Sequence, residues 1–167
     1  MLRRMFLALA LLAPLASLAA QDAPLTVFVV RHAEKGSENP DPSLTEAGQR
    51  RAAALARTLT DTRVTALFAS EFKRTQETLA PLAKATGLTP FVVSAGKMDE
   101  LIGMLRALPA GSRAVVASHS NLVHLIVERL SGQKVPALTD QDYDRMVVAM
   151  IQGEGKGQVV VLRYGEP

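Results

Sequence analysis

Apolar and polar positions along this chain follow two periods, one typical of buried strands and one typical of helices. Short apolar, largely β-branched runs occupy residues 26–30, 66–69, 91–93, 114–118, 146–151 and 158–163. Runs of this kind are typical of strands that are buried on both faces. Between them, apolar residues recur at helical spacing within residues 52–59, 79–83, 101–108 and 122–129. The alternation predicts a three-layer α/β domain with a mainly parallel central sheet flanked by helices.

Charged and imidazole side chains follow the ends of these predicted strands. The first strand stops on Arg31 and His32, and the fourth stops on His119. The segment after the second strand opens a helix and carries Arg74 near its N-terminus, where unpaired N–H groups favour an anion. Arginine forks bind phosphate oxygens two at a time, and an imidazole can attack phosphorus or donate a proton near neutral pH. Because open α/β sheets bind ligands beyond the carboxyl ends of their strands, the pattern predicts a pocket for a phosphoryl dianion.

Four segments of the chain resemble the signatures of the histidine phosphatase superfamily, which includes the phosphoglycerate mutases and acid phosphatases. Arg31-His32-Ala33-Glu34 resembles its Arg-His-Gly-Glu signature with alanine in place of glycine, residues 44–48 its Leu-Thr-x-x-Gly segment, residues 70–78 its Ser-x-x-x-Arg-x-x-x-Thr segment, and residues 118–121 its Gly-His-Ser block. The segments occur in the family's order and span residues 27–121. Four ordered motifs are far more specific than one, and the chain resembles the phosphoglycerate mutase-like branch.

The resemblance implies a role for each of the four pocket residues. His32 is expected to be the nucleophile, which attacks phosphorus to form a phosphohistidine. Arg31, Arg74 and His119 are expected to bind the phosphoryl oxygens. Two fixed guanidinium groups stabilise negative charge on the transferring group, and their field disfavours protonation of His32. This chemistry requires neither a metal nor another cofactor.

The general acid is the least defined part of the expected site. Larger relatives use a glutamate, or an aspartate that follows the second histidine, whereas serine and asparagine follow His119 here. Asp99 and Glu100 lie where mutase-like members keep their glutamate, so they are the first candidates. The alternative is that both are first-turn acids favoured by a helix dipole.

Glu34 is the third candidate for the acid, because it directly follows the first motif. Two other roles are open to it. It would orient Arg31, or it would pair with Lys35.

The helix that follows the first motif has predicted features of its own. Ser43 and Glu46 have the spacing of a capping box. We expect Arg50, Arg51 and Arg57 on the solvated faces of this helix.

Residues 1–19 have the three regions of a secretory signal peptide. A basic start is followed by an apolar run over residues 5–18 and by small residues, so cleavage is expected after Ala19 or Ala20. The apolar run is short for a spanning helix, and a chain with no cysteine cannot carry a lipoprotein anchor. We expect a bacterial periplasmic or secreted protein, with residues 24–167 as its single catalytic domain.

Net charge excludes one class of partner. The formal charge of +3 falls to about +1 after cleavage, because Arg3 and Arg4 leave with the signal peptide. This near-neutral balance is not that of a nucleic-acid-binding protein. No stable membrane insertion is expected after cleavage.

The sequence therefore predicts a phosphomonoester hydrolase that acts on a small-molecule phosphomonoester, with envelope sugar phosphates among the candidate substrates. Two alternatives stay open, a phosphohistidine-protein phosphatase and a phosphate-binding pseudoenzyme. A metal site formed by His32, His119 and His124 is disfavoured, because a spacing of five places the last two on different helix faces.

Overall fold

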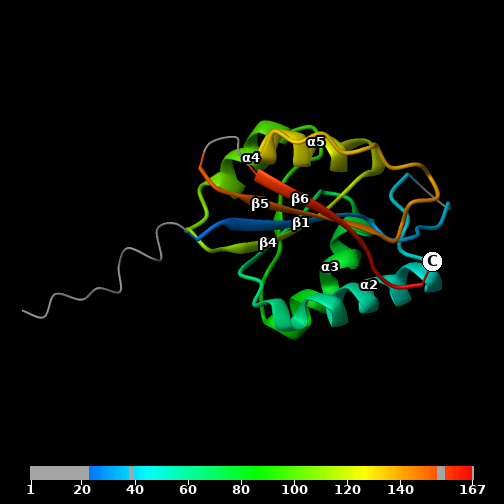
Figure 1. The fold of residues 1–167 in the computed structure, drawn as a ribbon. Coiled ribbons are helices and arrows are strands. Elements are labelled where there is room, and N and C mark those ends of the chain that lie inside the picture. The colour runs from blue at the N-terminus through cyan, green and yellow to red at the C-terminus, as the bar shows by residue number, and fades with distance from the viewer. Residues whose placement is uncertain (1–22, 38–39, 154–156, 167) are drawn as a thin grey trace, which may run out of the picture.

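The computed structural model describes residues 23–37, 40–153 and 157–166, so the predicted signal peptide over residues 1–19 lies outside the described residues. The elements in chain order are β1 (Leu25–Arg31), α2 (Glu46–Leu59), the 3-10 helix η1 (Thr60–Thr62), β2 (Ala66–Ala69), α3 (Lys73–Thr86), β3 (Phe91–Val92), α4 (Met98–Arg106), β4 (Arg113–Ser118), α5 (Ser120–Ser131), β5 (Arg145–Ile151) and β6 (Gly157–Arg163). Helices α4 and α5 cover one face of the sheet, and α2 and α3 cover the other (Figure 1). The predicted three-layer α/β architecture is confirmed. No helix within the described ranges has the length and apolar character needed to cross a membrane.

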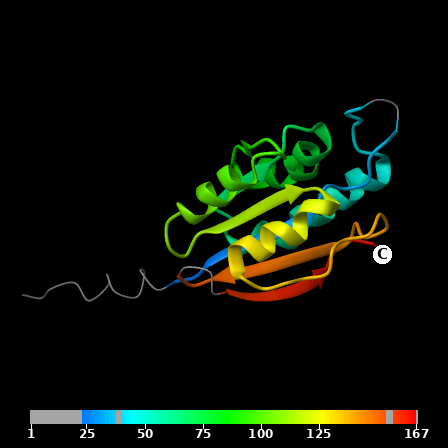
Figure 2. The ribbon, with the colours of Figure 1, turned by 90° about the horizontal axis from the view of Figure 1, so that it is seen from above.

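The six strands form one sheet in the order β3-β2-β4-β1-β5-β6. Strands β3, β2, β4 and β1 run parallel to one another, whereas β5 is antiparallel to β1 and β6 is antiparallel to β5. Figure 2 shows β5 and β6 side by side at one side of the sheet. The sheet is therefore mainly parallel, as predicted, with an antiparallel hairpin added next to its first strand.

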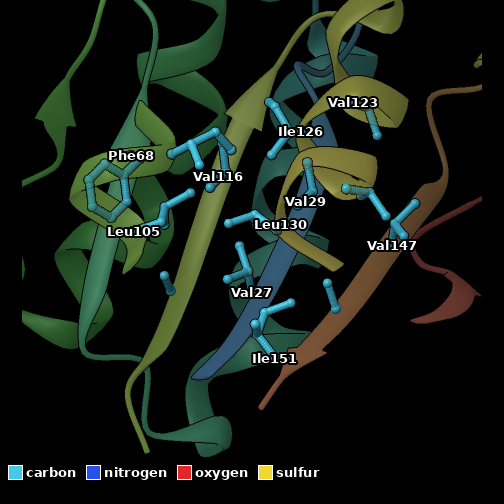
Figure 3. Packing of buried hydrophobic residues seen from close by; sticks show 14 of the residues in the cluster. Val27, Val29, Phe68, Leu105, Val116, Val123, Ile126, Leu130, Val147 and Ile151 are labelled. Atoms are coloured by element: carbon cyan, nitrogen blue, oxygen red, sulfur yellow. The ribbon is translucent and has the colours of Figure 1, made fainter. Parts of the chain in front are cut away.

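Strand β1 lies inside the sheet, and both of its faces are buried. Val27 and Val29 belong to the cluster that packs beneath α5 and α4, where Ile126 and Leu105 meet the sheet (Figure 3). The alternate residues of β1, among them Val30, pack on the opposite face with side chains of α2 and α3. Because successive strand residues point to opposite faces, a strand covered by helices on both faces is apolar throughout.

The sheet register brings three strand ends together. Arg31 of β1 is paired with Ser118 of β4, so His32 and His119 each follow the end of one of two neighbouring strands. Strand β2 lies on the other side of β4 and ends one residue before Ser70. The fold thus positions these side chains at the carboxyl edge of the parallel strands, where the sequence predicts the site.

Helix α2 begins two residues later than the capping box predicted. Its N-cap is Thr45, whose hydroxyl accepts a hydrogen bond from the Gly48 N–H at 3.2 Å. Ser43 cannot start the helix, because its carbonyl accepts from Gly36 N–H in a short antiparallel contact with the segment after β1. A Cβ added to Gly48 would lie 2.1 Å from the Glu34 carbonyl oxygen, so this close approach requires glycine.

Candidate active site

His32 is held by its own backbone directly after β1. The side chain is buried, with 4% of the residue exposed, and Nδ1 lies 2.8 Å from the Ala33 carbonyl oxygen. A carbonyl oxygen only accepts, so Nδ1 carries the proton of this bond. In the neutral ring, Nε2 therefore holds the lone pair.

The surroundings of His32 keep its ring neutral. Burial is the largest influence and lowers the pKa of His32 from 6.5 to about 4. The hydrogen bond to Ala33 opposes this shift, and the positive charges of Arg31 and Arg74 and the repulsion between two protonated histidines at positions 32 and 119 assist it. Near neutral pH, Nε2 is thus available as a nucleophile.

Arg31 is bound by a loop that lies far away in the sequence. Its Nη1 donates to the carbonyl oxygens of Thr139 and Asp140 at 3.1 Å each, and its Nη2 donates to the Tyr143 hydroxyl at 3.2 Å. The guanidinium carbon lies 3.9 Å from the centre of the Tyr143 ring, which also makes an edge contact with the ring of His32. Within the described residues, Nε of Arg31 is buried and has no hydrogen-bond partner.

Sequence reasoning missed Tyr143, which lies two residues before β5. No local pattern marked it, because its position depends on the pairing of the strands. Strand β5 is antiparallel to β1 and begins at the edge where β1 ends, so the segment that precedes β5 lies near Arg31.

Arg74 is the second residue of α3, and the buried threonines of the same motif fix this helix to the site. The Thr78 hydroxyl accepts from the Ala33 N–H at 2.9 Å, which joins α3 to the residue after His32. The Arg74 guanidinium lies over the Phe72 ring at 4.2 Å. Like that of Arg31, its buried Nε has no hydrogen-bond partner among the residues described.

His119 is the N-cap residue of α5 and faces His32. The two ring centroids are 5.5 Å apart in an edge-to-face arrangement. Its Nε2 lies 3.0 Å from the Ser70 hydroxyl, a contact that the sequence analysis did not predict. Burial, followed by the field of Arg74, lowers the pKa of His119 to about 4, so this ring is also neutral near pH 7.

Carboxylates lie around this group of cations and histidines. Asp41 is 3.6 Å from Nη1 of Arg74, and Asp140 is 3.9 Å from Nη2 of Arg31. Glu71 exerts a field on His119. Although burial alone would raise the pKa of Glu71, hydrogen bonds from the Ala95 N–H and other groups hold it below its usual value. Glu71 is therefore a carboxylate near neutral pH and a poor proton donor.

The structure does not bring Asp99 or Glu100 to this cluster. Asp99 is exposed and forms an ion pair with Arg129. Arg129 lies ten residues beyond His119 in the chain, which is about 15 Å along a helix. Glu100 is exposed and pairs with Lys97 at 3.1 Å. Both acids lie in the first turn of α4, which is the alternative that the sequence left open.

Glu34 forms an ion pair with Arg51, and not with Arg31 or Lys35. Its carboxylate accepts from Nε of Arg51 at 2.9 and 3.0 Å, and Nη2 of the same arginine is 2.7 Å away. The expectation of a solvated Arg51 is wrong, because its Nη1 also donates to the carbonyl oxygens of Tyr164 and Glu166 and the side chain is buried. Arg50 and Arg57, by contrast, are exposed as expected.

The described part of the chain holds no group of three or more histidine, aspartate or glutamate side chains placed to bind a metal ion. His32 and His119 face each other, whereas His124 lies one turn further along α5 and is half-buried. His124 therefore lies apart from the two facing histidines.

The α/β fold thus gathers the buried Arg31, the half-buried Arg74 and two neutral histidines at the ends of its parallel strands. Such a group can bind an anion next to an imidazole that carries a lone pair. The model of the histidine phosphatase superfamily (branch 1) matches residues 27–96, which contain the first three of the four sequence motifs. The match confirms the resemblance to this superfamily that the sequence motifs gave, and this similarity supports phosphatase activity.

Solved structures share the fold over most of the chain. The protein histidine phosphatase SixA complexed with tungstate is 21% identical, with a TM-score of 0.70, and the match covers 83% of this chain and 96% of that one. Mycobacterial glucosyl-3-phosphoglycerate phosphatase is 13% identical, with a TM-score of 0.65 over 83% of this chain and 97% of that one. A comparison with curated proteins found no match.

Proposed function

We propose that the protein is a phosphomonoester hydrolase that works through a phosphohistidine on His32. The observation that carries this proposal is the pairing of a buried, neutral His32, whose Nε2 holds the lone pair, with two arginines whose buried Nε groups are unpaired within the described residues. Each of those N–H groups is a donor without an acceptor. A bound phosphoryl group would supply the acceptors.

The reaction runs in two steps. Nε2 of His32 attacks phosphorus, the bond to the leaving oxygen breaks, and the phosphoryl group is transferred to the ring. Arg31 and Arg74 stabilise the charge on the phosphoryl oxygens during the transfer. Water then attacks the phosphohistidine and restores the free ring. The arginines supply the positive charge, so the proposal requires no metal.

A second candidate function follows from the fold comparison. A protein histidine phosphatase is among the structures that share this fold, so a phosphohistidine side chain of another protein is an alternative substrate. The predicted signal peptide favours instead a periplasmic or secreted enzyme that acts on a small phosphomonoester, such as an envelope sugar phosphate.

The test uses the purified protein with p-nitrophenyl phosphate in the presence of EDTA. We expect turnover by the wild type, undiminished by EDTA, and none by His32→Ala. Gln49→Ala, at an exposed position of α2, serves as the control and should match the wild type. A metal requirement would contradict the mechanism, and a protein that binds phosphate without turnover would be the phosphate-binding pseudoenzyme.

A further inference from the structure

The hydroxyl of Thr75 fixes the direction of a hydrogen-bond chain that ends on His119. Thr75 is fully buried, and its Oγ1 lies 2.8 Å from the Phe72 carbonyl oxygen and 3.1 Å from the Ser70 carbonyl oxygen. Carbonyl oxygens only accept hydrogen bonds. If the Thr75 proton pointed elsewhere, the lone pairs of its oxygen would face those of both carbonyl oxygens and be repelled by them. The proton of Thr75 is therefore committed to these carbonyls.

Ser70 must then donate to Thr75. The two hydroxyl oxygens are 2.9 Å apart and one proton is needed between them, which Thr75 no longer has. The hydroxyl proton of Ser70 is therefore donated to Thr75 and is not available to His119. The remaining contact, 3.0 Å between Ser70 Oγ and Nε2 of His119, needs a proton from the ring. The Phe72 N–H is a second, longer donor to Ser70 Oγ at 3.4 Å.

The chain of donors thus protonates His119 on Nε2 and leaves the lone pair of the neutral ring on Nδ1. A lone pair repels a phosphoryl oxygen, so neutral His119 in this tautomer cannot donate to the bound group from Nδ1. The charged and titratable groups around the ring are Arg31, Arg74, Glu71 and His32. A phosphoryl dianion placed among them would shift the balance toward the imidazolium form.

We propose that His119 takes up a proton on Nδ1 when the phosphoryl group binds, and that this proton is the one delivered to the leaving oxygen. The inference rests on the proposed function. It assigns the general acid to the second histidine. Of the described carboxylates near the site, Asp41 and Asp140 lie on the arginines and Glu71 is held ionised by hydrogen bonds, whereas Asp99 and Glu100 belong to α4.

The proton balance closes over the cycle. The substrate binds as the dianion, and Nδ1 of His119 takes up one proton from the solvent. When Nε2 of His32 forms its bond to phosphorus, the electron pair of the breaking P–O bond stays on the leaving oxygen. That oxygen takes the proton from His119 and departs as an alcohol. In the second step, the attacking water gives one proton to Nδ1, and the P–N bond breaks with its electron pair returning to His32. Hydrogen phosphate then leaves as the dianion, and the proton on Nδ1 returns to the solvent, which restores neutral His119.

The first test reads the tautomer and proton uptake directly. Nitrogen-15 NMR of the free protein at pH 7.5 should show His119 neutral and protonated on Nε2. Calorimetric titration with inorganic phosphate, repeated in buffers of different ionisation enthalpy, should show uptake of about one proton per bound dianion. A free ring protonated on Nδ1, or binding without uptake, would overturn the proposal.

Two matched variants test the direction of the chain. Thr75→Val keeps the shape but removes the acceptor, which frees Ser70 to donate to Nε2; His119 should then carry its proton on Nδ1, and proton uptake should be lost. Thr75→Ser keeps the hydroxyl and should keep the uptake. Should Thr75→Val fail to fold, Ser70→Ala replaces it, and uptake should fall because Nε2 loses its acceptor. Unchanged proton uptake in Thr75→Val, or in Ser70→Ala if that variant replaces it, would refute the assigned direction of the hydrogen bonds.

A kinetic comparison tests the delivery of the proton. His119→Asn should lose about 10²-fold more kcat with an alkyl phosphate than with p-nitrophenyl phosphate, because nitrophenolate leaves without a proton. Equal losses would refute the assignment. Since p-nitrophenyl phosphate turnover by the wild type tests the proposed function alone, failure of the inference is distinguishable from failure of that function.

Discussion

We expect His32 and His119 to make the folded protein less stable as the pH is lowered, at pH values above those at which carboxylates are protonated. Each has a pKa of about 4 in the folded protein, against 6.5 in the unfolded chain. Below pH 6.5 the unfolded chain binds protons at these two positions and the folded protein does not. Protonation therefore favours unfolding, and the stability that is fully present above pH 6.5 is lost as the pH falls toward 4.

The size of the effect follows from the two pKa values of each histidine. Lowering the pH from 7.5 to 5 should cost about 2 kcal/mol of unfolding free energy for each buried histidine, or about 4 kcal/mol for the pair. For a domain of this size, such a loss lowers the melting temperature by roughly 10 °C.

Thermal unfolding followed by circular dichroism at the two pH values measures this difference. His32→Gln should remove about half of it, and the double variant with His119→Gln should remove most of it. Ser131→Ala, which deletes a buried hydroxyl that donates to the Val127 carbonyl, is the control and should lower the melting temperature equally at both pH values. If the double variant kept the full pH dependence, neither histidine would be buried in its neutral form as described.

Three further changes test other parts of the structure. Arg74→Lys keeps the charge but loses the fork, so kcat/KM should fall by about 10²-fold and inhibition by vanadate should weaken in parallel; no change in either would remove Arg74 from the phosphate site. Gly48→Ala places a Cβ 2.1 Å from the Glu34 carbonyl oxygen and should destabilise the fold by about 1–3 kcal/mol in denaturant titration, whereas unchanged stability would contradict that close approach. Asp99→Asn combined with Glu100→Gln should reduce kcat no more for an alkyl phosphate than for p-nitrophenyl phosphate; a larger loss with the alkyl substrate would return the acid to α4.

Local sequence determined the part of the site that follows the parallel strands. A strand buried on both faces is apolar throughout, so its end is marked by the first charged residue, and Arg31 and His32 stand at that point. His119 follows the neighbouring strand by the same logic. Residues at such ends are neighbours because parallel strands share an edge.

Contacts that join distant segments were beyond the sequence. Arg51 has the spacing of a solvated helix position, but it is buried because the chain returns after β6 and offers it the carbonyl oxygens of Tyr164 and Glu166. Tyr143 reaches Arg31 across a sequence separation of 112 residues. No local sequence pattern marks the residues that contact Arg51 and Arg31, since these contacts form only when the strands assemble into the sheet.

Side-chain direction was also beyond the sequence. Asp99 and Glu100 are near the expected segment, yet one turn of helix decides whether an acid faces a pocket or solvent, and α4 pairs both with surface cations. The Ser70 and Thr75 hydroxyls lie within a recognised motif, but their contact with each other and the link from Ser70 to His119 depend on the packing of β2, α3 and β4.

The central claim is a covalent phosphohistidine on His32, and rapid-mixing labelling tests it most directly. The protein is mixed with a substrate labelled at phosphorus, quenched in alkali within the first turnover, and mapped by peptide. The account predicts a label on the peptide that contains His32, stable to alkali and lost in acid. Turnover without any such label, or a label on another residue, would contradict it.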